Sequence, residues 1–234
     1  MADDSKKLSK SIHNDINAFL KKVAQTPRVK SAAERGRLIF AMDATASREA
    51  AWDHACRLQA EMFTETAALG GLEIQLCYYR GFSEFEASPW LSNSRDLLQR
   101  MTGVSCLGGH TQIEKILRHA VQETRRKKID ALVFVGDCLE ENIDELCRVA
   151  GELALLGVPM FIFHEGHDPL AAMGFQQLAE LTRGAYCPFD SNSAQQLKQL
   201  LGAVAVYAAG GRKALENYNQ RQGKVVLQLT QRKP

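Results

Sequence analysis

The sequence lacks an apolar run long enough to cross a bilayer, which takes about 20 residues. The apolar stretch near its C-terminal end, Leu200 to Ala209, is far shorter than that. The first residues, Met-Ala-Asp-Asp-Ser-Lys-Lys, contain no apolar signal core. We therefore expect no transmembrane helix and no export, and we expect a cytoplasmic location.

The chain also lacks a strong excess of charge of one sign. It carries 29 Lys and Arg against 27 Asp and Glu, a formal net charge of +2. One basic cluster occurs at residues 125–128, where a helix is expected to end, and cations at that position favour the negative end of the helix dipole. The charge pattern gives no reason to expect nucleic-acid binding.

Paired cysteines and nucleotide-binding glycine motifs are missing as well. The six cysteines include no C-x-x-C pair, so a zinc or thioredoxin-like site is not expected. We expect reduced thiols that serve mostly as small core residues. The absence of a P-loop or dinucleotide-binding motif disfavours nucleotide turnover by this chain.

What is present is an ordinary globular composition, with 45% hydrophobic and 24% charged residues among 234. Apolar residues at helical spacing between residues 5 and 24 predict an amphipathic helix, and a connector containing Pro27 follows it. We expect residues 1–34 to form this helix and connector, residues 35–209 one α/β domain, and residues 210–234 a C-terminal tail.

Within the domain, predicted strands and helices alternate. The tight turn at Arg80-Gly81 predicts an antiparallel hairpin at a sheet edge. The expected strands are 37–42, 72–79, 82–87, 129–135, 158–163 and 185–189, and the expected helices are 48–68, 92–101, 112–127, 141–156, 170–183 and a last one capped by Ser193. The pattern predicts a Rossmann-like three-layer α/β fold with a mostly parallel sheet, one antiparallel edge strand and helices on both faces. A ligand site belongs at the carboxyl ends of its strands.

Oxygen-bearing side chains occur in three loops that are expected at this edge of the sheet. Asp43, Thr45 and Ser47 follow the first strand, Thr111 follows Gly108-Gly109, and Asp137 follows the strand at 129–135. Carboxylates and hydroxyls are hard ligands that suit Mg²⁺ or Mn²⁺ better than zinc or copper. The three loops therefore predict one divalent-metal site.

This pattern resembles the von Willebrand factor A (vWA) domain family, over roughly residues 35 to 205. The family's metal-ion-dependent adhesion site (MIDAS) reads D-x-S-x-S, then a distant T and a distant D, and the five residues above match it in order. The antiparallel edge strand also fits the family's topology. Three positions depart from it: Thr45 replaces the usual Ser, His110 separates the glycines from Thr111, and Cys138 stands where glycine is common. These departures concern metal affinity more than the fold.

The resemblance implies a six-coordinate Mg²⁺ or Mn²⁺. Thr45, Ser47 and Thr111 would bind it directly, Asp43 and Asp137 largely through water, and an Asp or Glu of a partner protein would fill the open position. Intracellular relatives commonly work with AAA+ ATPases or chaperone-like machines. The expected function is a non-catalytic protein-binding module within a larger assembly.

Simpler interpretations compete at several positions. Residues 43–47 alone could be a helix N-cap. Residues 164–168 (His-Glu-Gly-His-Asp) could form a second metal site or an acid/base pair, but we favour Asp168 as a helix cap before Pro169 and the histidines as loop residues near the rim. Cys138 is interpreted as a small loop residue rather than a nucleophile, and Trp52 as a core residue.

The alternative function is a metal-dependent phosphoryl-transfer hydrolase with Asp43 as nucleophile and Asp137 as a Mg²⁺ ligand. Haloacid-dehalogenase-like phosphatases also place an Asp after the first strand. They require a second Asp two residues later, where this chain has Thr45. The mismatch removes the general acid, so the binding module is preferred.

Overall fold

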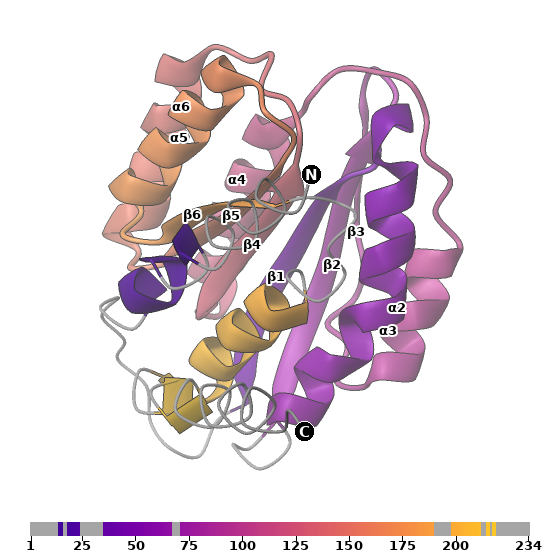
Figure 1. Ribbon diagram of the computed structural model, residues 1–234, viewed down its shortest axis with the longest axis vertical. Helices are drawn as coiled ribbons and strands as arrows, with labels where there is room; N and C mark the ends of the chain where they lie inside the picture. The colour runs from indigo at the N-terminus through magenta and orange to yellow at the C-terminus, as the bar shows by residue number, and fades with distance from the viewer. Residues whose placement is uncertain are drawn as a thin grey trace, which may run out of the picture.

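The computed structural model describes residues 14–15, 18–23, 35–66, 71–189, 198–211, 214–215 and 217–218. The strands of these residues form one six-stranded sheet in the order β3-β2-β1-β4-β5-β6 (Figure 1). Every neighbouring pair is parallel except β2 and β3, which are antiparallel. The predicted α/β fold class, with its mostly parallel sheet and antiparallel edge strand, is confirmed.

The central strands are buried on both faces. Every residue of β1 (Gly36–Asp43) and β4 (Ala131–Gly136) is buried. A parallel sheet that is covered on both sides requires nearly continuous apolar strands. The remaining strands are β2 (Leu72–Arg80), β3 (Glu84–Ala87), β5 (Met160–Glu165) and β6 (Ala185–Phe189).

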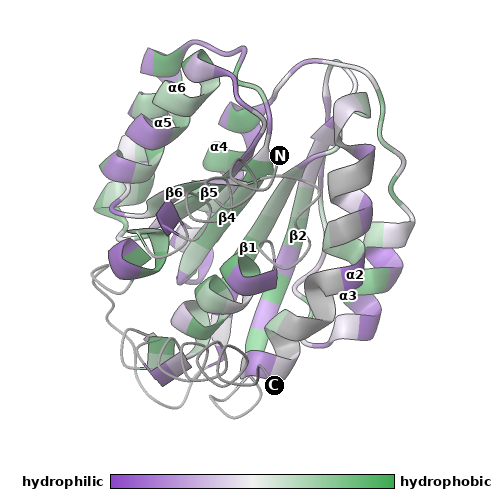
Figure 2. Ribbon diagram, viewed as in Figure 1, coloured by the Kyte–Doolittle hydropathy of each residue, from purple (hydrophilic) through white to green (hydrophobic). Residues whose placement is uncertain are grey.

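Helices cover both faces of the sheet. A short 3₁₀ helix, η1 (Ala46–Arg48), leads into the first long helix of the domain. One face packs against α2 (Glu49–Thr66), α3 (Ser94–Thr102) and a helix of residues 198–211. The other packs against α4 (Ile113–Arg126), α5 (Ile143–Leu155) and α6 (Pro169–Leu181). Figure 2 shows that the central strands are mainly hydrophobic, whereas hydrophilic residues recur along the helices. In the described part of the chain, no helix combines the length and apolar character needed to span a membrane.

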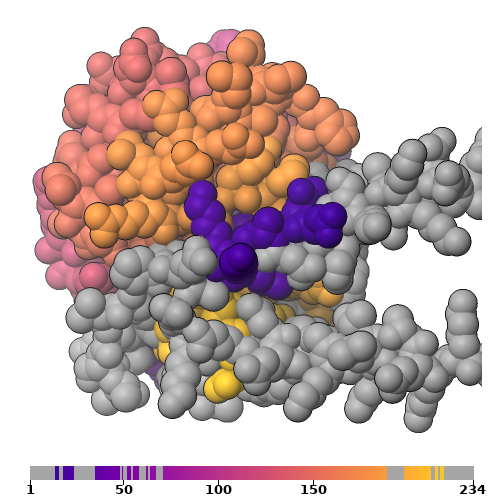
Figure 3. All heavy atoms as spheres, turned by 60° about the vertical axis from the view of Figure 1, so that its left-hand side comes forward, coloured from indigo at the N-terminus to yellow at the C-terminus, as the bar shows by residue number. Residues whose placement is uncertain are grey.

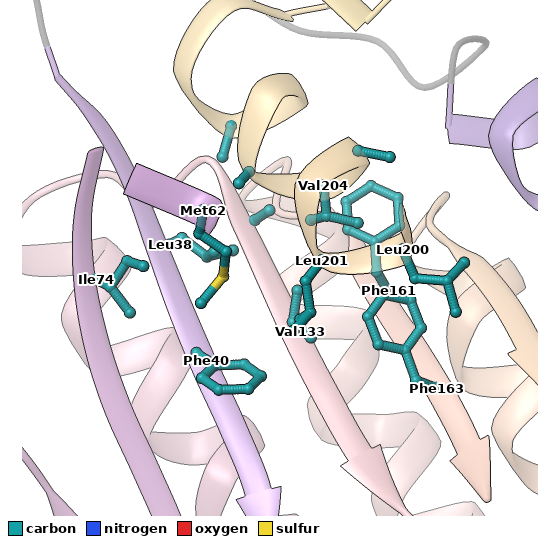
Figure 4. Close-up of a cluster of buried hydrophobic side chains, with 14 of the residues drawn as sticks. Leu38, Phe40, Met62, Ile74, Val133, Phe161, Phe163, Leu200, Leu201 and Val204 are labelled. Atoms are coloured by element: carbon teal, nitrogen blue, oxygen red, sulfur yellow. The ribbon is translucent and has the colours of Figure 1, made fainter. Parts of the chain in front are cut away.

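The helix of residues 198–211 lies across the middle of the sheet. Its Leu200, Leu201 and Val204 are buried in the same cluster as Val133 of β4 and Phe161 of β5 (Figure 4). This apolar stretch is therefore core. Residue 193, expected as the cap of this helix, and the apolar segment 225–229 of the tail lie outside the described residues.

Residues 18–23 are helical and pack onto the same face of the sheet. Phe19 and Val23 are buried, and the Phe19 ring lies 5.4 Å from that of Phe163. Lys22 pairs with Glu180 of α6 at 3.6 Å. Figure 3 shows the N-terminal residues, in indigo, against the orange surface of this region. The described part of the predicted N-terminal helix thus covers the chain's own core.

The strand order reverses beside β1. The chain leaves β1 for β2 on one side and later returns to β4 on the other side of β1. Such a reversal opens a crevice at the carboxyl ends of the two strands, where open α/β sheets bind ligands. Residue Asp43 ends β1 and Asp137 follows β4, so two predicted metal-site residues lie at this crevice.

Two sequence-based predictions, on His164 and on the start of the third strand, were wrong. His164 belongs to strand β5 and is buried, so it is not a loop residue at the rim. The third strand begins at Glu84 rather than residue 82, because residues 81–83 form the hairpin turn. The cysteines lie mostly in or against the core, as expected: Cys77 and Cys187 are buried in it, and Cys56, Cys106 and Cys147 are half-buried and pack against it.

Candidate metal centre

All five predicted site residues line one cavity. The cavity has a volume of about 390 Å³, lies at the carboxyl ends of β1 and β4, and is lined by Asp43, Thr45, Ser47, Thr111 and Asp137 together with Ala46, Gly108, Gly109, Cys138 and Glu140. Three loops that are distant in sequence thus contribute oxygen atoms to a single hollow. Glu140 is an additional carboxylate that the sequence analysis did not single out.

Both carboxylate oxygens of Asp43 are fixed. Oδ1 accepts a hydrogen bond from the Thr45 backbone N–H at 2.7 Å, and Oδ2 accepts one from the Tyr79 hydroxyl at 3.0 Å. The side chain is only 1% exposed. Burial raises the pKa of Asp43, the nearby Asp137 raises it further, and the hydrogen bonds from Thr45 and Tyr79 oppose the shift. Burial thus disfavours the charged form of this carboxyl, because water solvates it poorly.

The hydroxyls of the first loop connect to the carboxylate of the third. Thr45 Oγ1 lies 3.3 Å from Ser47 Oγ, and Ser47 Oγ donates to Asp137 Oδ2 at 2.7 Å. A hydroxyl that donates its proton to a carboxylate keeps its lone pairs for a cation. Thr45 is the N-cap of η1, yet its side chain makes no capping hydrogen bond. Helix capping alone therefore does not explain the hydroxyls at positions 45 and 47.

The Thr111 loop is positioned through its backbone. Leu107 N–H donates to Ala44 O at 3.0 Å, which ties this loop to the one after β1. A Cβ on Gly109 would lie 1.8 Å from Gly81 O, so only glycine permits this approach. Thr111 itself is buried. Thr111 exchanges two hydrogen bonds with Glu140, which is not among the five predicted ligands.

Glu140 and Glu141 join the Asp137 loop to the start of α4. Glu140 Oε2 accepts from Thr111 N–H at 2.9 Å, and the Glu140 backbone N–H donates to Thr111 Oγ1 at 3.1 Å. Glu141 accepts from the Ile113 and Glu114 backbone N–H groups at 3.0 and 2.8 Å. These acids satisfy N–H groups that have no partner inside α4. The two loops are held as one unit.

His164 forms a hydrogen bond with the backbone of Asp137. Its Nε2 lies 3.2 Å from the Asp137 carbonyl oxygen, and its Nδ1 lies 2.8 Å from the Tyr186 hydroxyl. Because a carbonyl oxygen only accepts, Nε2 carries the proton, and in the neutral ring Nδ1 accepts from Tyr186. The two ends of segment 164–168 therefore have different roles. His164 contacts the Asp137 carbonyl, whereas Asp168 caps α6 by accepting a hydrogen bond from Leu170 N–H at 2.9 Å, as predicted.

The donor set fits a hard divalent cation. Three carboxylates (Asp43, Asp137 and Glu140) and three hydroxyls (Thr45, Ser47 and Thr111) line the cavity, and these are ligands of the kind that Mg²⁺ and Mn²⁺ accept. Among the residues that the structure describes, no group of three or more His, Cys, Asp or Glu is arranged to hold a metal ion. A cation here would therefore depend on the hydroxyls.

Comparisons with known proteins bear on the fold. No family model matches the sequence, and no curated protein matches it. The structure is similar to the SpRpn10 VWA domain, with a TM-score of 0.55 and 12% identity over 76% of this chain and 98% of that one. It is also similar to the vWF domain of the type V pili tip protein Mfa5 from Porphyromonas gingivalis, with a TM-score of 0.57 and 10% identity over 75% and 97%.

A third similar structure contains a metal. Proximal thread matrix protein 1 from the mussel byssus, described with a zinc-occupied MIDAS motif, gives a TM-score of 0.56 and 14% identity over 76% of this chain and 47% of that one. At 10–14% sequence identity, these similarities are evidence for a shared backbone fold only. The chain has the Rossmann-like α/β fold of vWA domains.

Proposed function

We propose that this chain is a protein-binding module that holds Mg²⁺ or Mn²⁺ through Asp43, Thr45, Ser47, Thr111 and Asp137. The ion's open position then receives an Asp or Glu side chain of a partner protein. The partner class suggested by the family resemblance is a larger assembly, such as an AAA+ ATPase or a chaperone-like system.

The observation that carries the proposal is the Ser47–Asp137 hydrogen bond inside the shared cavity. These two residues are 90 positions apart in the chain, and their oxygens lie 2.7 Å apart. Loops from β1 and β4 thus converge closely enough for one ion to contact both. The mussel protein of similar fold is described with a zinc-occupied MIDAS motif, which supports the proposal that a chain of this fold holds a metal.

The charge of the donor set favours a partner carboxylate. Of the five proposed ligands, Thr45, Ser47 and Thr111 offer neutral oxygens and only Asp43 and Asp137 are charged, while Glu140 lines the cavity outside this set. A cation with neutral ligands at several positions keeps a strong attraction for another anion. The ion in turn stabilises the buried charge of Asp43, which burial alone disfavours.

The position of Asp43 argues against the phosphoryl-transfer alternative. A nucleophilic carboxylate needs an oxygen that a substrate can reach. Both oxygens of Asp43 accept hydrogen bonds, and the side chain is almost fully buried. The residue two positions later is Thr45, which cannot act as the general acid.

Calorimetric titration with MgCl₂ and MnCl₂ tests the proposal. Wild-type protein should bind one ion, and Asp43→Ala and Thr111→Ala should each weaken binding by roughly 10–100-fold, as loss of groups around a metal does. Asp53→Ala is the matched control, because Asp53 is an exposed carboxylate on α2 that does not line the cavity.

The same variants should be assayed for hydrolysis of p-nitrophenyl phosphate. Binding of a metal without turnover supports the module. Absence of ion binding by the wild type would contradict it, and turnover that disappears in Asp43→Ala would support the hydrolase instead.

A further inference from the structure

A large aromatic side chain is exposed beside the candidate metal centre. Phe82, in the turn between β2 and β3, is 77% exposed. Aromatic side chains are frequent anchors of protein interfaces. The turn follows the carboxyl end of β2, so it lies at the same edge of the sheet as the metal cavity.

The turn that carries Phe82 is fixed against the wall of the cavity. His110 N–H donates to Gly81 O at 3.2 Å, and the Gln112 side chain donates to Arg80 O and Gly81 O, each at 3.2 Å. Gly109, which lines the cavity, approaches Gly81 so closely that no side chain fits between them. The backbone immediately before Phe82 is thus tied to the loop that lines the cavity.

A continuous path of contacts leads from Phe82 to the cavity. The Phe82 and His110 rings meet edge to face with their centroids 5.4 Å apart. His110 Nδ1 lies 3.4 Å from Glu140 Oε2, and Glu140 lines the cavity. An extended chain advances ~3.3 Å per residue. A segment whose acidic side chain enters the cavity would reach Phe82 within about three residues.

The two ends of this path differ in chemistry. The charged residues that line the cavity are Asp43, Asp137 and Glu140, all carboxylates, which suit a cation and through it an anion. The Phe82 and His110 end offers an aromatic face and an imidazole. A purely acidic segment would leave Phe82 uncovered, whereas a segment that combines an acid with an apolar side chain would match both ends.

We propose that Phe82 and His110 form the apolar half of a two-part docking surface, whose other half is the metal-loaded cavity. The occupant is an extended segment of a partner protein that carries an Asp or Glu with a large aliphatic or aromatic residue within three positions of it. This proposal rests on the metal-bridged function proposed above and specifies the partner's chemistry.

Selection from a displayed library of random 12-residue peptides tests the docking surface. The full chain is loaded with Mg²⁺, and bound peptides are eluted with EDTA. Enriched peptides should contain an acidic residue with a large apolar residue within three positions. Peptides synthesised from the selected sequences should bind Phe82→Ala at least about tenfold more weakly, as loss of an aromatic anchor does.

Controls separate the two halves of the surface. Phe82→Ala should bind Mg²⁺ as the wild type does, because Phe82 does not line the cavity. Leu155→Ala should bind the peptides normally, since Leu155 is 91% exposed but lies at the end of α5, which runs away from the carboxyl edge. Phe82→Leu, which stays apolar, should lose less affinity than Phe82→Ala, and circular dichroism checks that each variant is folded.

The outcomes distinguish this proposal from the function on which it rests. Acidic peptides that elute with EDTA but show no apolar preference, or that bind Phe82→Ala as tightly as wild type, would overturn the docking surface and leave the metal bridge standing. Failure to enrich any acidic, EDTA-eluted peptide would overturn the metal bridge and the docking surface together.

Discussion

Thr111 and Glu140 hold each other through two reciprocal hydrogen bonds. The Thr111 backbone N–H donates to Glu140 Oε2 at 2.9 Å, and the Glu140 backbone N–H donates to Thr111 Oγ1 at 3.1 Å. Displacement of either loop breaks both bonds. The pair fixes the hydroxyl of a proposed metal ligand and places a third carboxylate at the cavity.

Glu140→Gln separates these two effects. Glutamine keeps an oxygen that accepts from Thr111 N–H but removes the negative charge. A divalent ion about 6 Å from a carboxylate in water gains on the order of 1.4 kcal/mol, so Mg²⁺ affinity should fall on the order of tenfold. The loss of charge should also strengthen binding of acidic peptides to the metal-loaded protein, because Glu140 repels an incoming carboxylate. Calorimetry measures both.

Glu141→Gln is the matched comparison for this prediction. Glu141 also accepts backbone hydrogen bonds from the start of α4, yet it does not line the cavity. Its effect on Mg²⁺ affinity should be smaller than that of Glu140→Gln. Equal effects of the two variants would show that Glu140 acts only through the general negative potential of this loop.

His164→Phe should weaken metal binding without altering any group that lines the cavity. The substitution leaves the Asp137 carbonyl and the Tyr186 hydroxyl without the imidazole that now bridges them. Groups that orient metal ligands typically contribute 10–100-fold to metal affinity. The free energy of unfolding should fall by about 1–3 kcal/mol, the cost of leaving a buried polar group unsatisfied.

Tyr186→Phe distinguishes orientation of Asp137 from loss of core packing. It removes the hydroxyl bond to His164 and keeps the ring, so the His164 bond to Asp137 remains. We expect a decrease in stability with Mg²⁺ affinity close to that of the wild type. A Tyr186→Phe variant as defective in Mg²⁺ binding as His164→Phe would contradict this assignment.

The raised pKa of Asp43 predicts how stability depends on pH in the absence of metal. Because burial raises the folded-state pKa above the unfolded value, the folded protein binds a proton that the unfolded chain has already released. The free energy of unfolding therefore decreases as pH rises from the unfolded pKa of Asp43 through its folded pKa, and the decrease is complete above it.

Asp43→Asn removes this titration. In EDTA at neutral pH the variant should unfold at a higher temperature than the wild type, and the difference should shrink as the pH falls through the same interval. In Mg²⁺ the order should reverse, since an ion at 100 times its Kd stabilises the wild type by about 2.7 kcal/mol. Thermal unfolding in EDTA and in Mg²⁺ measures this, and equal wild-type stability in the two buffers would contradict it.

The position of the site could be predicted from sequence because polar residues come directly after the apolar runs that form strands. Asp43 and Asp137 each follow an apolar run, and parallel strands end at the same edge of a sheet. The register confirms the alignment, since Met42 pairs with Val135, one residue before Asp43 and two residues before Asp137. This alignment brings the Asp43 and Asp137 loops together, whereas the Thr111 loop reaches the cavity through backbone contacts to Ala44 and Gly81. Occupation by a metal stays a prediction.

Glu140 and His164 could not be predicted in the same way. An acid at the start of a helix is ordinarily explained by the helix dipole, so Glu140 gave no distinct signal. His164 follows the apolar run 158–163 and resembles a loop residue. Its burial depends on Phe175 and Tyr186, whose rings lie 5.1 and 5.9 Å from its own, and these contacts arise only in the folded sheet.

Arg37 is a buried cation at the amino ends of the strands, opposite the metal cavity, and we expect it to contribute to stability alone. Arg37, in the first half of β1, lies 3.7 Å from the centre of the Trp90 ring and within 4 Å of Glu73 and Glu123, and it donates to the Lys127 and Lys128 carbonyls. Arg37→Met should lower the free energy of unfolding by about 3 kcal/mol, since removal of one member of a buried ion pair leaves its partners uncompensated.

Lysine should not rescue this position, because an ammonium group cannot stack on Trp90 and reach both carbonyls as the planar guanidinium does. Arg118→Met is the control: its pair with Glu114 is exposed, so the expected loss is about 0.5 kcal/mol or less. Urea unfolding measures all three variants. Mg²⁺ affinity should be unchanged in folded Arg37→Met, because Arg37 lies toward the amino end of β1 and Asp43 ends that strand; a large change in affinity would mean that the two edges of the sheet are coupled.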